Sequence, residues 1–133
     1  MRKIEVRHFR SPDERRPFVE HGEAKVYRFG DRTIGLGTFE PGWRWSKDVG
    51  PIAGTKSCQA AHTGFVTSGR MMIRMDSGEE VEVSAGDFVI IPPGHDAWVL
   101  GDDTCVVIDW SGMEHYAEAQ PGTGMQPEAG TWH

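Results

Sequence analysis

The chain has 133 residues and a formal net charge of −6. This length fits one domain with one core, and the acidic charge argues against a nucleic-acid or anionic-membrane binder, because phosphate contacts need a basic face. No apolar run approaches the roughly 20 residues of a membrane span, and the two cysteines lack the CxxC spacing of a zinc ribbon. We therefore expect a soluble, cytoplasmic protein without a nucleic-acid or membrane partner.

Short apolar segments, several alternating with period two, recur between turns rich in glycine and proline. This pattern predicts β-strands, and many short strands joined by such turns indicate an all-β sandwich or barrel. The predicted strands are 4–9, 25–29, 33–39, 62–67, 70–75, 81–83, 88–91, 97–100 and 104–110. A helical period of twelve or more residues is absent, and residues 111–120 could form two turns of helix at most.

One hairpin is marked clearly in the sequence. Met71, Ile73 and Met75 alternate with polar residues, and Asp76-Ser77-Gly78 then leads into a second alternating segment at 80–83. A short turn rich in Asp, Ser and Gly between two alternating segments predicts antiparallel pairing.

The composition divides the chain into three parts. Residues 1–24 are mildly basic and are expected to form an N-terminal arm or edge strand. Residues 25–110 are expected to form the β-barrel domain, with Cys105 and Trp110 in its core. Residues 111–133 contain no Lys or Arg and are rich in Gly, Pro and Thr. Such a C-terminal tail buries little, and we expect it to be loose or to dock on a neighbouring subunit.

The segment around residues 86–96 is the most informative for chemistry. Gly86-Asp87 forms a predicted turn, residues 88–91 form a strand expected to be fully buried, and Pro92-Pro93-Gly94 forms a stiff second turn. A rigid turn of this kind delivers the residues that follow it to a fixed place. Those residues are His95 and Asp96.

This pattern resembles the cupin superfamily, whose members are small jelly-roll β-barrels. Gly86, Pro92 and Gly94 match the second motif of the family without gaps. In the first motif, six residues separate an acidic metal ligand from a turn glycine, and here six residues separate His62 from Gly69. The resemblance implies a single jelly-roll barrel, a metal site inside it and a homodimer.

The sequence departs from the family at the other ligand positions. The usual His-x-His pair, counted back from His62, falls on Lys56 and Cys58. If it is counted forward from Gly42 instead, it falls on Asp48 and Gly50.

The second motif departs as well, because its histidine is expected at Ala97, where a one-residue deletion would place Asp96. Within the resemblance, the candidate metal ligands are Cys58, His62 and His95, with Asp96 as a substitute ligand, an orienting acceptor or a catalytic base. On a straight strand Cys58 and His62 would lie about 13 Å apart, so they share a metal only if the chain bends between them. These side chains suit a divalent transition metal such as zinc, iron, nickel, cobalt or manganese.

Aromatic residues suggest a binding pocket. Trp43, Trp45 and Trp98 are candidates to line the mouth of the barrel, where a ligand would meet an apolar wall with few polar groups. Arg44 and Arg70 are the cationic residues expected nearest to this mouth. Arg44 could pair with a substrate carboxylate or could simply be solvated.

Other catalytic classes have no support in the sequence. It contains no phosphate-binding glycine loop followed by a helix, no G-x-S-x-G turn and no H-E-x-x-H motif. The spacing also reveals no base that would activate a serine or cysteine nucleophile. We therefore expect a metal-dependent enzyme that acts on a small organic molecule, with oxygenase, isomerase and lyase chemistry all open. The alternative is a metal-free ligand-binding or sensor cupin, and a third possibility is a structural scaffold with a plugged barrel.

Overall fold

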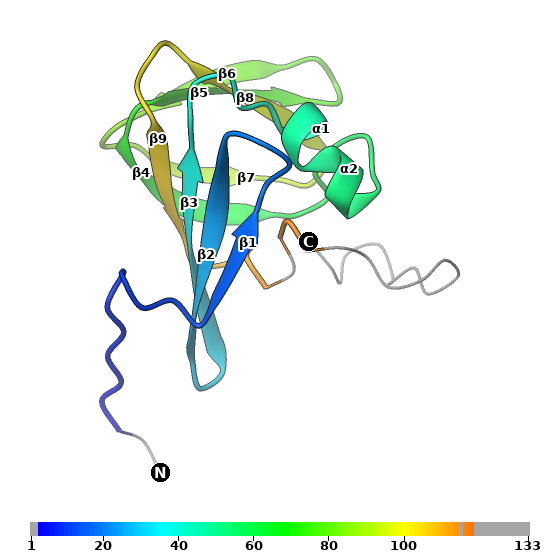
Figure 1. Ribbon diagram of the computed structural model, residues 1–133. Helices are drawn as coiled ribbons and strands as arrows, with labels where there is room; N and C mark the ends of the chain where they lie inside the picture. The colour runs from blue at the N-terminus through cyan, green and yellow to red at the C-terminus, as the bar shows by residue number, and fades with distance from the viewer. Residues whose placement is uncertain (1–2, 115, 119–133) are drawn as a thin grey trace.

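A computed structural model describes residues 3–114 and 116–118. In this part of the chain, nine strands form two antiparallel sheets, and two short helices join β3 to β4 (Figure 1). The strands are β1 (Glu14–Pro17), β2 (Gly22–Phe29), β3 (Arg32–Phe39), β4 (His62–Ser68), β5 (Arg70–Met75), β6 (Glu80–Ser84), β7 (Phe88–Ile91), β8 (His95–Leu100) and β9 (Cys105–Asp109).

The two sheets enclose one core. The larger sheet has the strand order β1-β2-β3-β9-β4-β7, and the smaller sheet has the order β6-β5-β8. The buried residues of the core come from both sheets, for example Val66 and Cys105 from the larger and Met71 and Ala97 from the smaller. All strand pairs are antiparallel and sequence neighbours often lie in different sheets, which confirms the predicted jelly-roll arrangement.

Most strands lie where the sequence pattern predicts them. β2 to β9 correspond to eight predicted segments, and β5 and β6 form the predicted hairpin, with Arg74 opposite Glu80 and Gly78 at a φ of 101° in the turn. Residues 4–9 are not a strand, and the first strand is β1 instead. Three of the four β1 residues are Glu14, Arg15 and Arg16, so β1 has no apolar alternation to reveal it. It occupies the edge of the larger sheet.

The two helices were not predicted. α1 (Trp45–Asp48) and α2 (Gly50–Ala53) have four residues each, which is too short for a helical period in the sequence. Gly54, at a φ of 79°, ends the second. In the described part of the chain, no helix has the length and apolar character needed to cross a membrane.

Two predictions about burial are wrong. Phe88 and Ile90 in β7 are 77% and 79% exposed, because β7 ends the larger sheet and only its inner face, with Val89 and Ile91, meets the core. Trp110 is 46% exposed, because it follows the last strand and stands on the outer face beside Phe88. Cys105 is fully buried, as predicted.

The segment after β9 packs against the domain. Met113, Tyr116 and Ala117 are buried, contrary to the expectation that this segment buries little. The guanidinium of Arg16, itself 4% exposed, donates hydrogen bonds to the backbone carbonyls of Met113, Glu114 and Tyr116 at 2.8–3.0 Å. Residues 111–114 and 116–118 contain no helix. The rest of the predicted tail, residues 119–133, lies outside the described residues.

Candidate metal centre

A cavity of about 60 Å³ lies between the two sheets. Its walls are mainly apolar side chains of both sheets, together with Trp43 and Trp45 from the segment after β3. Among the described residues, its polar lining consists of the side chains of His62, His95, Asp109 and Tyr116 together with the unpaired indole N–H groups of Trp43 and Trp45. A mostly apolar cavity with a few clustered polar groups is typical of a small-molecule site.

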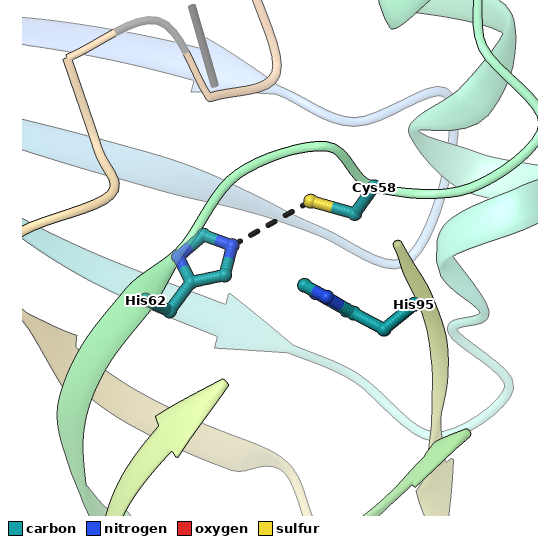
Figure 2. Close-up of side chains that lie close together, drawn as sticks. All are labelled: Cys58, His62 and His95. Atoms are coloured by element: carbon teal, nitrogen blue, oxygen red, sulfur yellow. Dashed lines mark hydrogen bonds between the residues drawn. The ribbon is translucent and has the colours of Figure 1, made fainter. Parts of the chain in front are cut away.

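Three potential metal ligands converge beside this cavity, and two of them, His62 and His95, line it. One ligand atom from each of Cys58, His62 and His95 lies within 4.8 Å of the others. The Cys58 Sγ is 3.5 Å from the His62 Nε2, and Figure 2 shows the His95 ring pointing toward the same space. The structure thus brings together the three residues that the sequence singled out as candidate ligands.

A bend of the chain brings Cys58 to His62. Cys58 forms a β-bridge with His95, in which the Cys58 N–H donates to the His95 carbonyl at 2.7 Å and the Cys58 carbonyl accepts from the Gly94 N–H at 2.7 Å. Cys58 therefore runs alongside the start of β8, whereas His62 begins β4. The chain turns over the three intervening residues, which belong to no strand, and this removes the 13 Å separation of a straight strand.

The stiff turn before β8 orients His95. Gly94 has a φ of 89°, a left-handed conformation that suits glycine. The His95 Nδ1 lies 2.8 Å from the Pro92 carbonyl oxygen and donates to it. A donating Nδ1 leaves the Nε2 lone pair of His95 free to bind a metal.

Asp109 orients His62 in the same way. The His62 Nδ1 donates to Oδ2 of Asp109, the last residue of β9. Oδ1 of the same carboxylate accepts the backbone N–H groups of Ser111 and Gly112, each at 2.9 Å. Gly112 packs so closely on the His62 ring that no side chain would fit there. Sequence reasoning missed Asp109, although the segment Asp109-Trp110-Ser111-Gly112 at a strand end has the Asp, Ser and Gly typical of a turn.

This arrangement also corrects the expectation that no base lies beside a cysteine. The sequence revealed no base beside a cysteine, but the fold places the His62 imidazole beside the Cys58 thiol and the Asp109 carboxylate behind it. The sequence does not reveal this arrangement, because Asp109 lies 47 positions from His62.

The pKa values in the cluster follow from burial and neighbouring charge. Burial raises the pKa of the Cys58 thiol, but hydrogen bonds and charge from His62 and His95 outweigh it and lower the pKa to about 6. Burial lowers the pKa of His62, but Asp109 and Cys58 raise it to about 10. Burial raises the pKa of Asp109, yet its hydrogen bond with His62 brings that pKa below the usual range. These directions favour the Cys58 thiolate, the form in which cysteine binds metals.

Tyr116 covers the cluster from the segment after β9. Its ring meets the His62 ring edge to face, with centroids 5.4 Å apart. Burial raises the pKa of Tyr116 well above its usual range, and the negative charges of Cys58 and Asp109 add to this. Sequence reasoning missed Tyr116 because its segment has neither an apolar period nor a known motif.

The donor set fits a transition metal. Two ligand atoms bound to one tetrahedral zinc ion at about 2.0–2.3 Å lie roughly 3.3–3.8 Å apart, and the distance from Cys58 Sγ to His62 Nε2 is 3.5 Å. One thiolate and two imidazoles suit zinc, iron, cobalt or nickel better than manganese, which prefers oxygen ligands. Cys58, His62 and His95 therefore form a group that could hold a metal ion.

Asp96 lies outside the cavity. Alternate residues of β8 point to opposite faces of the sheet, so His95 and Ala97 face the core while Asp96 faces away. Its carboxylate accepts hydrogen bonds from the Arg44 Nε and the Ser46 N–H, both at 3.0 Å. The structure therefore does not bring Asp96 to the three candidate ligands.

The candidate substrate-binding residues divide into two groups. Trp43 and Trp45 line the cavity, and each is 2% exposed. Trp98 shares the outward face of β8 with Asp96, and the Arg44 guanidinium lies over its ring at 4.4 Å. Arg70 is exposed at the start of β5 and pairs with Glu82 at 3.2 Å. Trp98, Arg44 and Arg70 are thus outside the cavity wall.

Comparisons with known proteins agree with this architecture. Residues 54–111 match the family model of the cupin domain. A protein of unknown function from Rhizobium leguminosarum has 19% identity and a TM-score of 0.55, and the alignment covers 81% of this chain and 97% of that one. A second protein of unknown function, from Acidithiobacillus ferrooxidans, has 18% identity and a TM-score of 0.53, with 75% and 87% covered. A comparison with curated protein sequences finds no match.

At such low identity, the structural likeness shows the fold alone. The matched segment 54–111 includes Cys58, His62 and His95, together with the motif residues around Gly86 and Pro92. Together with the jelly-roll fold, this match supports the assignment of residues 54–111 to the cupin superfamily.

Proposed function

We propose that the protein is a metal-dependent enzyme whose divalent transition metal is held by Cys58, His62 and His95 and whose substrate is a small organic molecule in the cavity. One observation carries this proposal. Both histidines have their Nδ1 engaged, by Asp109 and by the Pro92 carbonyl, so each offers Nε2 to the space beside the Cys58 thiol. Histidines fixed in this way by a second hydrogen bond are typical of metal ligands.

Catalysis is supported by the position of two of the three ligands, His62 and His95, at the cavity wall. Catalytic zinc sites typically have three protein ligands and a fourth position for water or substrate. His62 and His95 both line the cavity, so a ligand there would have access to that position. A bound metal would supply Lewis-acid polarisation of a substrate oxygen or, with iron, oxygen activation.

The residues around the centre have separate tasks in this proposal. Asp109 holds the proton on the His62 Nδ1, and the Pro92 carbonyl holds that of His95. Tyr116 and the apolar wall exclude bulk water, which strengthens electrostatic interactions inside the cavity. Asp96 has no part in it, because its carboxylate is bound outside the cavity by Arg44.

A specific observation also favours the alternative of a metal-free ligand-binding cupin. The Cys58 thiol and the His62 imidazole hydrogen-bond to each other, so the cluster can satisfy its polar groups without an ion. The apolar cavity would then serve to capture a ligand.

Two measurements distinguish the metal-dependent enzyme from the metal-free ligand-binding protein. They are elemental analysis of untagged protein and a cobalt(II) titration followed by visible absorption. We expect one metal per chain and a cobalt–thiolate absorption band. Cys58→Ser, His62→Ala and His95→Ala should each weaken cobalt binding at least tenfold. Cys105→Ser, a buried thiol of β9, and His8→Ala, an exposed histidine, are the matched controls. Protein that binds no metal under any of these conditions would reject the proposal and leave the ligand-binding alternative.

A further inference from the structure

The cavity also indicates which class of molecule it takes. We propose that the ligand of this site is a small apolar molecule with one oxygen-bearing head group, of which a short monocarboxylate is the simplest form, and that Tyr116 donates a hydrogen bond to that head group. The head-group part of this inference rests on the proposed metal centre, and the rest follows from the cavity wall.

The wall offers almost nothing to a polar ligand body. Among the described residues, its side chains away from the metal cluster are apolar, for example Phe39, Val66, Met71 and Ile73, apart from the unpaired indole N–H groups of Trp43 and Trp45. No Lys, Arg, Ser, Thr, Asn or Gln of the described chain lines the cavity. A polar group buried without a hydrogen-bond partner costs several kcal/mol by transfer measurements, so sugars and other polyhydroxylated molecules are disfavoured.

Charge limits the ligand further. The lining carboxylate, Asp109, is already engaged by His62 and by two backbone N–H groups. The described wall contains no cationic side chain that could balance a second negative charge away from the cluster. A phosphate ester or a dicarboxylate would therefore lose its hydration without compensation.

The size of the cavity sets an upper limit. One water molecule needs about 10–15 Å³ of such space, and the cavity offers about 60 Å³. The ligand body therefore has only a few carbon atoms unless the wall moves.

Tyr116 is a polar side chain of the wall that is a candidate donor, alongside the unpaired indole N–H groups of Trp43 and Trp45. Asp109, His62 and His95 all have hydrogen-bond partners, whereas the Tyr116 hydroxyl has none within the described residues. The ring of Tyr116 rests on His62, which places this residue next to the cluster. A phenol is a good donor to a carboxylate or carbonyl oxygen, so Tyr116 is a candidate to fix the head group.

The test uses cobalt-loaded protein and reads the change in its visible spectrum on addition of acetate, butyrate and 4-methylpentanoate. We expect the affinity to rise about fourfold with each added methylene. Glutarate and inorganic phosphate should bind at least tenfold more weakly than 4-methylpentanoate. Tyr116→Phe should weaken the binding of 4-methylpentanoate about five- to tenfold and leave the affinity for cobalt unchanged.

Tyr27→Phe is the matched control. The Tyr27 hydroxyl donates to the Phe9 carbonyl at 2.5 Å and is not part of the cavity wall, so this variant should bind the carboxylates normally. An affinity that does not grow with chain length, or that favours glutarate or phosphate, would overturn the ligand class. Normal carboxylate binding by Tyr116→Phe would overturn the role of Tyr116.

A failure of the proposed function would look different, because cobalt would then give no thiolate absorption band. In that case the same carboxylates are titrated against tryptophan fluorescence, which reports on Trp43 and Trp45 in the wall. The same preference for a longer apolar chain would support the ligand class without the metal. No preference would overturn it.

Discussion

The His62 imidazole donates a hydrogen bond from Nδ1 to the Asp109 carboxylate, and the opposite nitrogen, Nε2, faces the Cys58 thiol. One side chain thus connects the end of β9 to the candidate metal centre. We expect Asp109→Asn to weaken zinc and cobalt binding about 10- to 100-fold, the usual effect of removing a carboxylate behind a ligating histidine.

A competition titration with a chromogenic chelator measures this effect. Asp96→Asn is the matched control, because the Asp96 carboxylate binds Arg44 and Ser46 outside the cavity. Equal loss of affinity in both variants would show that Asp109 has no special role in orienting His62.

The two cysteines should differ in their reaction with iodoacetamide. Both thiols are buried, but Cys58 hydrogen-bonds to His62, a residue of the cavity wall, and its pKa is lowered to about 6, whereas burial raises the pKa of Cys105 to about 11. In protein treated with a chelator, we expect alkylation at Cys58 and none at Cys105. Added zinc should protect Cys58, because the thiolate would be bound. Mass spectrometry of peptides measures both sites, and labelling that zinc leaves unchanged would argue against Cys58 as a ligand.

Arg16 should hold the segment that carries Tyr116. Its guanidinium donates to three backbone carbonyls of residues 113–116 while it is buried. Arg16→Met leaves these carbonyls without partners, and we expect a loss of about 2–4 kcal/mol in the free energy of unfolding. Hydrogen exchange at residues 113–118 should also become faster than in the parent protein.

Arg15→Met is the comparison for this variant. Arg15 is the neighbour of Arg16 in β1, and its partner is Glu23 in a solvent-exposed pair. An exposed pair of this kind contributes about 0–1 kcal/mol. If both variants unfold alike and exchange in the segment is unchanged, the segment does not depend on Arg16.

Glu14 should contribute stability that depends on pH. Its pKa is lowered to about 2, chiefly by its hydrogen bond with Arg16, against the effect of burial and with further help from Arg28. A carboxylate with a lowered pKa stabilises the fold fully above its ordinary pKa of 4.5 and loses that contribution as the pH falls toward 2. Glu14→Gln should therefore lower the melting temperature at pH 7 and have little effect near pH 2.

Because Glu14 is partly solvated, we expect about 1 kcal/mol at pH 7. Calorimetry at several pH values measures the difference from the parent protein, with the exposed Glu20→Gln as reference. A constant difference across this pH range would contradict the assignment.

The homodimer implied by the family resemblance stays a prediction. The outer face of the larger sheet exposes Phe88 and Ile90, with Trp110 next to Phe88. If two copies pair through this face, Phe88→Asp should give a monomer without lowering the cobalt affinity. Light scattering during gel filtration measures the mass. A parent protein that is monomeric at micromolar concentration would contradict the prediction.

The strands could be predicted because their signal is local. Alternation of apolar residues marked β5 and β6, and the Asp76-Ser77-Gly78 turn between them marked the hairpin. β1 could not be predicted because three of its four residues are charged, so no alternation of apolar and polar residues marks it. The burial of Phe88 and Trp110 was predicted wrongly because composition does not reveal which strand ends a sheet.

For the candidate site, the sequence alone determined which residue types were available: a thiol at position 58 and imidazoles at 62 and 95, set in a cupin pattern. Only the tertiary structure decided which groups meet. Because side chains of β8 alternate between the two faces of the sheet, Asp96 points away from the cavity. Asp109 and Tyr116 contact His62 although they lie 47 and 54 residues away in the chain. The physical reason is that hydrogen bonds and ring packing depend on distances of a few ångströms, and strand pairing between distant segments sets those distances.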